Sequence, residues 1–143
     1  MYHNILVAIE HSSADDTIIR HVTELAKLTG AAVVLVHVAD GFAARHFEDL
    51  SLRESEEMRE DRVYLEALVE RLQREGLRVR ARLALGDPAT ELIKAARDEG
   101  VDLLAMATHG HRLVNDLLRG STVNRVRHEL AIPVLLLRRA AGG

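Results

Sequence analysis

The feature that most constrains the fold of this chain is a regular alternation of short apolar runs with segments of helical periodicity. The apolar runs, which we expect to be strands, lie at residues 5–9, 32–38, 77–83, 101–107 and 133–137. Apolar residues recur at the spacing of a helix face at residues 14–28, at 88–99 and within 108–130. Between the second and third runs, we expect a loose segment at 40–55, followed by a helix that extends to about residue 75. This alternation predicts an α/β domain with a parallel sheet.

The strands differ in how many of their faces are apolar, and this difference orders them in the sheet. Residues 77–83 alternate three arginines with apolar side chains, which is typical of an edge strand with one wet face. The runs at 5–9, 32–38 and 101–107 are apolar on both faces and belong in the interior. With right-handed crossovers, we predict an open five-stranded parallel sheet of order 3-2-1-4-5 with helices on both faces, a Rossmann-like nucleotide-binding sandwich.

This strand order places a topological switch point between the first and fourth strands, above whose carboxyl ends a ligand is expected to bind. The loops that should line it lie at residues 10–13, 107–112 and 120–122. Gly110 and Gly120 carry no Cβ, so nearby backbone N–H groups can approach a phosphate closely. Ser121 and Thr122 offer hydroxyl groups at a helix start, and Arg112 offers positive charge. The pattern therefore fits a phosphate loop, although a plain strand-to-helix turn also uses glycine.

Composition narrows the class of protein further. A chain of 143 residues predicts one domain, residues 1–143, and its 48% hydrophobic and 29% charged residues exclude a disordered chain. The net charge of -3 and the 3% aromatic content argue against a nucleic-acid partner. The chain has no cysteine and no apolar run near the roughly 18 residues of a membrane span. We therefore expect a soluble cytoplasmic protein with no membrane partner.

The segment from Ala107 through Gly110 to Gly120 and Ser121 resembles the nucleotide-binding signature of the universal stress protein family, Gly-x2-Gly-x9-Gly-[Ser/Thr]. The opening run at 5–9 and the closing run at 132–136 agree, so the resemblance covers essentially the whole chain. It implies a regulatory or signalling module of the stress response that binds an adenine nucleotide, with ATP expected first. Mg²⁺ would accompany the phosphates, because it prefers phosphate oxygens and carboxylates.

Two positions depart from the pattern of the family. Ala107 stands where the signature has its first glycine, and Glu10 stands where the ATP-binding members carry an aspartate that contacts the nucleotide. The resemblance also implies that Val38 and Met106 form the adenine-side wall. The residues expected to bind the nucleotide are Ile9, Glu10, Val38, Met106, Ala107, His109, Gly110, Arg112, Gly120, Ser121 and Thr122.

Three classes of function stay open at this point. The first is the nucleotide-binding regulator. The second is a nucleotide-free adaptor that acts through protein contacts, in which Ala107 and Glu10 mark a degraded pocket. The third is a slow ATPase, because no general base is positioned by the sequence and no catalytic residue is predicted. His11, His37, His109 and His111 can approach the crevice, but without a supporting carboxylate cluster they predict no dedicated metal site.

The last apolar run, at residues 133–137, indicates that the chain pairs with a second copy of itself. It forms the second edge of the sheet and is apolar on both faces, at Val134, Leu135, Leu136 and Leu137. The opposite edge strand carries its three arginines, whereas this one has no such protection, and an unprotected apolar edge pairs readily with another chain. We therefore predict a homodimer in which two copies of this strand pair across a two-fold axis, and the family resemblance implies the same mode.

Overall fold

The computed structural model describes residues 1–39, 47–108 and 120–138, with the backbone alone for 47–55. Its strands are β1 (Asn4–Ile9), β2 (Ala32–Ala39), β3 (Val79–Leu85), β4 (Leu103–Thr108) and β5 (Val134–Arg138). Its helices are α1 (Ala14–Thr29), α3 (Phe47–Arg74), α4 (Pro88–Glu99) and α5 (Gly120–Glu129). Three strands begin one or two residues later than their apolar runs, because strand pairing and not hydropathy alone sets their ends. No helix in the described parts is long and apolar enough to span a membrane.

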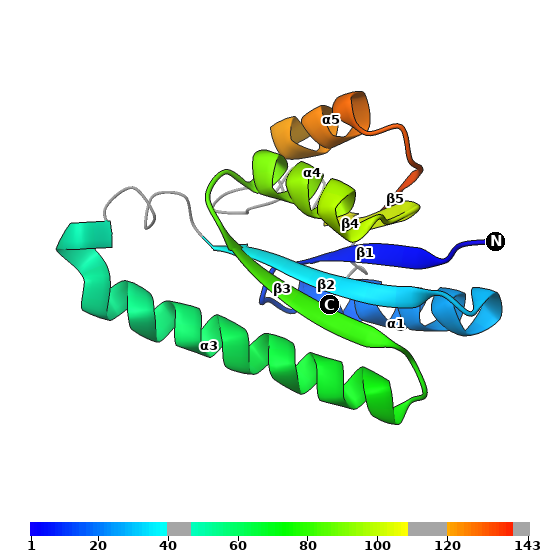
Figure 1. The fold of residues 1–143 in the computed structure, drawn as a ribbon, viewed down its shortest axis with the longest axis horizontal. Coiled ribbons are helices and arrows are strands. Elements are labelled where there is room, and N and C mark those ends of the chain that lie inside the picture. Colours follow the sequence, from blue (N-terminus) through cyan, green and yellow to red (C-terminus); the bar gives the residue numbers. More distant parts are fainter. Residues whose placement is uncertain (40–46, 109–119, 139–143) are drawn as a thin grey trace.

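The five strands form one parallel sheet in the order β3-β2-β1-β4-β5, as predicted (Figure 1). The strand β1 is central, since Ile5 pairs with Val33 of β2 on one side and with Leu103 of β4 on the other. The chain winds from β1 outward to β3 and then crosses back to β4. The switch point therefore lies between β1 and β4, where the sequence places it.

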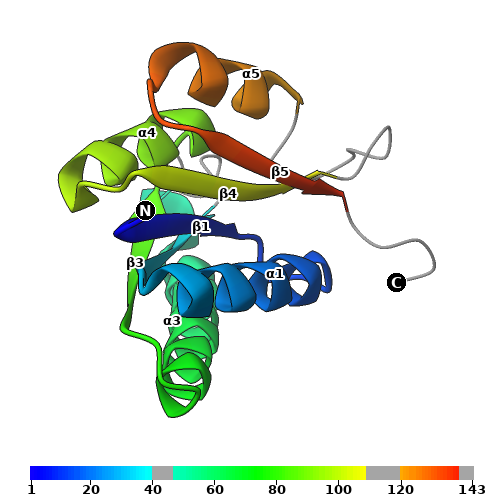
Figure 2. The same ribbon diagram turned by 90° about the vertical axis from the view of Figure 1, so that its right-hand side faces the viewer.

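Helices cover both faces of the sheet, with α1 and α3 on one face and α4 and α5 on the other (Figure 2). Alternate side chains of β1 enter separate cores. Ile5 and Val7 pack in the core beneath α1 and α3, whereas Leu6 and Ala8 pack in the core beneath α4 and α5. Every second residue of a strand faces the same side, so a strand that is apolar throughout must lie between two helical layers.

The helix α1 forms where its sequence signals predict it. Its buried face carries Ile18, Ile19 and Val22 at helical spacing. The helix ends at Gly30, whose φ of 74° is left-handed and whose N–H bonds the Ala26 carbonyl at 2.8 Å. The helix α4 begins after Asp87, which caps it by accepting a hydrogen bond from the Thr90 N–H at 2.9 Å.

The expectation of a loose segment at residues 40–55 was wrong over residues 47–55. The helix α3 begins at Phe47, and its first turns project beyond the sheet (Figure 1). Residues 47–55 are mostly glutamate, leucine and arginine, which are good helix formers, but they show no clear apolar face. Helical periodicity of apolar residues reveals only helices that have an apolar face, so it does not reveal this segment. Residues 40–46 lie outside the described part of the chain.

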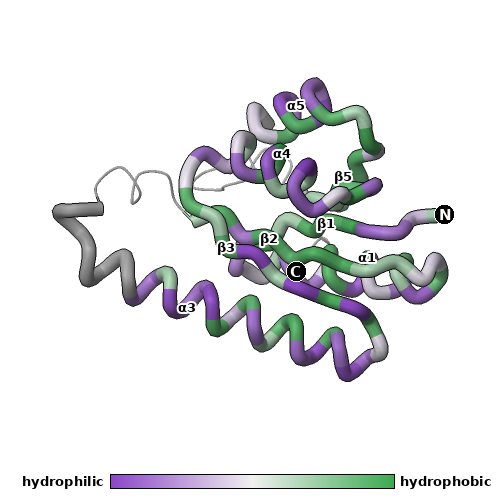
Figure 3. The backbone as a smooth tube through the Cα atoms, in the orientation of Figure 1, coloured by the Kyte–Doolittle hydropathy of each residue, from purple (hydrophilic) through white to green (hydrophobic). Residues whose placement is uncertain are grey.

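The strand β3 is an edge strand, and its polar and apolar residues alternate as predicted (Figure 3). Its arginines are tied to neighbouring elements. Arg80 bonds Glu99 at 2.8 Å, and Arg82 lies 3.0 Å from Asp98. The Arg80 guanidinium holds the pKa of the Glu99 carboxyl below its ordinary value. Carboxylates at the end of α4 thus pair with the arginines of β3. This edge strand therefore offers another chain little apolar surface to pair with.

Candidate functional site

Four of the predicted site residues lie in the carboxyl ends of adjacent strands, and all four are nearly fully buried. Val38 and Met106 pack in the core beneath α4 and α5, with exposures of 4% and 0%. Ile9 and Ala107 pack in the other core, on the opposite face of the sheet. The structure therefore brings Val38 and Met106 to one face of the sheet and places Ile9 and Ala107 on the other face.

Ala107 stands where the family signature has a glycine, and its backbone has a conformation that alanine adopts without strain. It lies inside β4, and among the described residues His11 alone, apart from glycines, has a positive φ. A side chain at Ala107 therefore causes no backbone strain. The departure from the family signature at this position leaves β4 regular.

The loop between β1 and α1 is organised by Asp15, which is 1% exposed. Its carboxylate accepts hydrogen bonds from the backbone N–H groups of Glu10 and His11, each at 2.9 Å, and of Ser12 at 3.2 Å. Ser12 Oγ accepts a further bond from the Ala14 N–H at 3.2 Å. The hydroxyl of Ser12 thus bonds the first residue of α1, whereas the N-cap Ser13 makes no side-chain cap bond. The backbone of Glu10 is held at the end of β1 independently of its side chain.

A side chain from α3 completes this arrangement. The Tyr64 hydroxyl donates a hydrogen bond to Asp15 Oδ2 at 2.6 Å. Burial, together with this bond, raises the pKa of the Tyr64 phenol above its ordinary value, so the phenol stays protonated and remains a donor. No local sequence pattern connects Asp15 to a tyrosine 49 positions later, so this bond could not be found from the sequence.

Two histidines meet around a carboxylate beside the same loop. His11 Nδ1 lies 2.7 Å from Asp61 Oδ1, and His37 Nε2 lies 3.4 Å from Asp61 Oδ2. His37 is 5% exposed, and its Nδ1 donates to the carbonyl oxygen of Ile9 at 2.8 Å. His11 and His37, which the sequence expects to approach the crevice, lie together at the ends of β1 and β2, and no sequence pattern indicated Asp61 of α3 between them. Within residues 1–39, 47–108 and 120–138, no group of three or more ligating side chains could hold a metal ion.

The last two residues of the signature, Gly120 and Ser121, lie at the start of α5. Gly120 is the first residue of this helix, so the prediction of a helix start at 120–122 is confirmed. Ser121 is exposed and Thr122 is buried in the first turn. This turn carries no acidic residue that would repel an anion. The predicted residues His109, Gly110 and Arg112 lie outside the described part of the chain.

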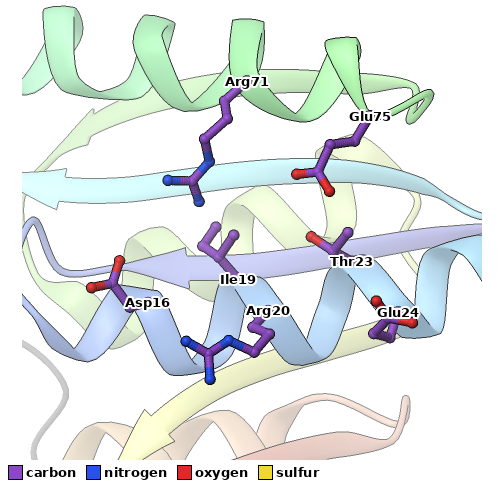
Figure 4. Close-up of a pocket in the computed structure, with 7 residues that line it drawn as sticks. All are labelled: Asp16, Ile19, Arg20, Thr23, Glu24, Arg71 and Glu75. Carbon is purple, nitrogen blue, oxygen red and sulfur yellow. The ribbon is translucent and has the colours of Figure 1, made fainter.

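A separate groove lies between α1 and α3, with a volume of about 270 Å³ (Figure 4). It is lined by Asp16, Ile19, Arg20, Thr23, Glu24, Arg71 and Glu75. None of the predicted site residues lines this groove. Its arginine and carboxylate side chains give it both signs of charge, so it is not the predicted phosphate site.

An open parallel sheet with a switch point between β1 and β4, an ordered loop after β1 and a helix start after β4 define the class of nucleotide-binding-like α/β domains. The chain belongs to the universal stress protein family, whose model matches residues 1–138. It is 32% identical to a universal stress protein of Thermus aquaticus over 143 residues, covering 96% of this chain and all of that protein.

Solved structures agree with the family. A Methanocaldococcus jannaschii protein, a universal stress protein by name, superimposes with a TM-score of 0.80 at 29% identity, covering 99% of both chains. A Burkholderia pseudomallei family member gives a TM-score of 0.77 at 30% identity, covering 97% of both chains. Two more distant universal stress proteins share the fold and were solved in complex with cAMP and with dAMP, at 17% and 22% identity and TM-scores of 0.66 and 0.65.

Proposed function

We propose that this protein binds an adenine nucleotide, ATP, at the carboxyl ends of β1 and β4, and that the bound state regulates its contacts with other proteins. The observation that carries the proposal is the position of the signature. Ala107 lies near the end of β4, one of the two strands at the switch point, and Gly120 with Ser121 begins α5, the helix between β4 and β5. Open α/β sheets bind their ligands at this point, and helix starts bind phosphates.

The start of α5 suits the phosphate end of the nucleotide. The first N–H groups of a helix have no partner within the helix and lie at the positive end of its dipole. Gly120 lets a phosphate approach these groups closely, and the exposed hydroxyl of Ser121 can donate to a phosphate oxygen. Mg²⁺ would enter with the phosphates, since it binds phosphate oxygens and few protein ligands.

The other end of the crevice suits the adenine end. Val38 and Met106 share one face of the sheet near the ends of β2 and β4, and from their buried positions they would back an adenine ring with apolar side chains. The relatives solved with cAMP and dAMP support an adenine ligand, because both of these molecules carry adenine. Regulation is favoured over rapid turnover, because no nucleophile next to a base is placed at the start of α5 within the described residues.

Gly120→Val tests the proposal directly. Calorimetry with ATP and Mg²⁺ should give one site per chain in the wild type. The variant should lose at least tenfold in affinity, because a branched side chain would stand against the phosphates. Asn124→Val is the matched control, since it adds the same side chain at an exposed position of α5 away from the helix start. Its affinity should equal that of the wild type.

Thermal denaturation gives a second measurement of the same property. A ligand at about 100 times its dissociation constant should stabilise the folded state by roughly 2.7 kcal/mol. If the wild type shows neither heat nor stabilisation at millimolar ATP, the nucleotide-free adaptor is the correct function. The comparison requires Gly120→Val to retain the wild-type circular dichroism spectrum.

Glu10→Ala should weaken ATP binding several-fold while the melting temperature of the free protein stays nearly constant. Asp15 fixes the backbone at Glu10, so truncating the Glu10 side chain should leave the loop in place. Substitutions of this kind usually change stability by no more than about 0.5 kcal/mol. Glu66→Ala, at an exposed position of α3, is the control for the loss of one carboxylate. Unchanged affinity in Glu10→Ala would show that this glutamate does not contact the nucleotide.

A further inference from the structure

The loop after β1 contains one residue in a costly conformation. His11 has a φ of 63°, in the left-handed region that favours glycine. A residue with a Cβ in this region loses on the order of 1 kcal/mol relative to right-handed backbone. Such a residue persists only where its surroundings hold it, and such positions cluster at functional sites. The contacts of His11 therefore bear on what its imidazole does.

Three contacts fix the orientation of His11. Its backbone N–H donates to Asp15 Oδ2 at 2.9 Å. Its ring stacks on Tyr64, with ring centroids 4.0 Å apart and planes 22° apart. Its Nδ1 lies 2.7 Å from Asp61 Oδ1, and the second oxygen of Asp61 faces His37. The imidazole is thus held by stacking on one face and by the contact at Nδ1, and the residue is also held by its backbone N–H.

This orientation decides which ring nitrogen is available to a ligand. A carboxylate only accepts hydrogen bonds, so the Nδ1 atom of His11 carries a proton, and whenever the ring is neutral its Nε2 carries a lone pair. Nε2 is directed away from Asp61, because the two ring nitrogens point in diverging directions. Within the part of the chain that the structure describes, Nε2 makes no hydrogen bond or ion pair. The side chain is 36% exposed, so a ligand can reach it.

His11 follows Glu10 directly at the carboxyl end of β1, next to the switch point. The bond from His37 to the Ile9 carbonyl places the cluster near the end of β2, one residue before Val38 and on the α3 side of the sheet. A neutral Nε2 can accept from a neutral donor but offers no proton to a phosphate. The donors of an adenine nucleotide are the ribose hydroxyls and the adenine amino group.

We propose that His11 Nε2 accepts a hydrogen bond from the nucleoside part of the bound nucleotide, which makes His11 a specificity-determining residue of the site. The inference rests on the proposed nucleotide binding. Asp61 is then a positioning residue, which holds the imidazole with its lone pair toward the ligand. The left-handed backbone at His11 is maintained by the same contacts that orient the ring.

The test compares ATP with three analogues, each lacking one candidate donor: 2′-deoxy-ATP, 3′-deoxy-ATP and inosine triphosphate. Calorimetry at about pH 8 keeps most imidazoles neutral. The wild type should bind one analogue about three- to tenfold more weakly than ATP, the usual effect of one hydrogen bond. The weakened analogue then identifies the donor, either a ribose hydroxyl or the adenine amino group.

His11→Gly should remove this discrimination with only a small change in melting temperature, because the strain that glycine relieves at a φ of 63° offsets part of the lost contacts with Tyr64 and Asp61. His3→Gly makes the same substitution at an exposed position just before β1, at the opposite end of that strand, and it should keep the discrimination. Asp61→Asn should reduce it while ATP remains bound. In nitrogen-15 spectra of the imidazoles, the His11 Nε2 resonance should shift when ATP is added to the wild type.

Discrimination that survives in His11→Gly would overturn the role of His11 while leaving ATP binding intact. A wild type that binds ATP and all three analogues equally would do the same. A wild type that binds no ATP would overturn the proposed function, and this inference with it. The affinity of the wild type for ATP therefore separates the two failures.

Discussion

Replacing Asp15 with alanine is expected to lower the free energy of unfolding by about 3 kcal/mol or more. The carboxylate is 1% exposed and accepts hydrogen bonds from three backbone N–H groups and from the Tyr64 hydroxyl. Alanine would leave these donors without their acceptor, and a buried donor without a partner costs about 1–3 kcal/mol. The substitution should also release the positive φ of His11, since Asp15 holds its N–H.

Denaturant unfolding followed by circular dichroism measures this loss. Asp16→Ala is the matched control, because Asp16 is the next residue of the same first turn but is exposed. It should change stability by no more than about 0.5 kcal/mol. Tyr64→Phe removes only one of the four bonds and should cost about 1 kcal/mol. Equal losses in Asp15→Ala and Asp16→Ala would show that the hydrogen bonds of Asp15 do not stabilise the loop.

The strand order could be predicted because it depends on a property that each strand shows in its own sequence. Ile5 and Leu6 face different cores, so β1 had to be apolar throughout. Arg80 and Arg82 could alternate with apolar residues because β3 has a neighbour on one side only. The start of α3 at Phe47 could not be predicted from an apolar face, since its first turns project beyond the sheet.

The candidate site likewise has features that could be predicted from the sequence and features that could not. The helix start at Gly120 is a local feature, and its signature could be found along the chain. The bonds of Asp15 to Tyr64 and of His11 to Asp61 join residues 49 and 50 positions apart. Neither pair has a local pattern, because packing of α3 against the sheet creates both. The long helix α3 therefore supplies the support of the loop after β1.

We propose that two copies of the protein associate through β5. This strand is hydrogen-bonded to β4 alone among the described strands, so no described strand occupies the pairing positions of its other edge. Leu135 and Leu137 pack toward the core of α1 and α3, whereas Val134 packs toward the other core. Leu136 is 39% exposed. Both faces of the edge are therefore apolar, and an isologous antiparallel pair would bury them together.

Leu136→Lys is expected to convert the dimer to a monomer. Sedimentation of the wild type at micromolar concentration should give about twice the chain mass of 15.9 kDa, and the variant should give the mass of one chain. A lysine at this position would place a charge in the paired edge, and burying an unpaired charge is strongly unfavourable. In the monomer the same lysine stays in water, so the fold should be retained.

Leu85→Lys gives a stringent control, because Leu85 is also 39% exposed and ends β3 at the opposite edge of the sheet. The two substitutions match in residue type, exposure and position on an edge strand. They differ only in which edge they charge. A dimer that persists in Leu85→Lys and dissociates in Leu136→Lys would assign the interface to β5. A wild type that sediments as a single chain would contradict the proposal, and equal dissociation in both variants would indicate a general loss of stability.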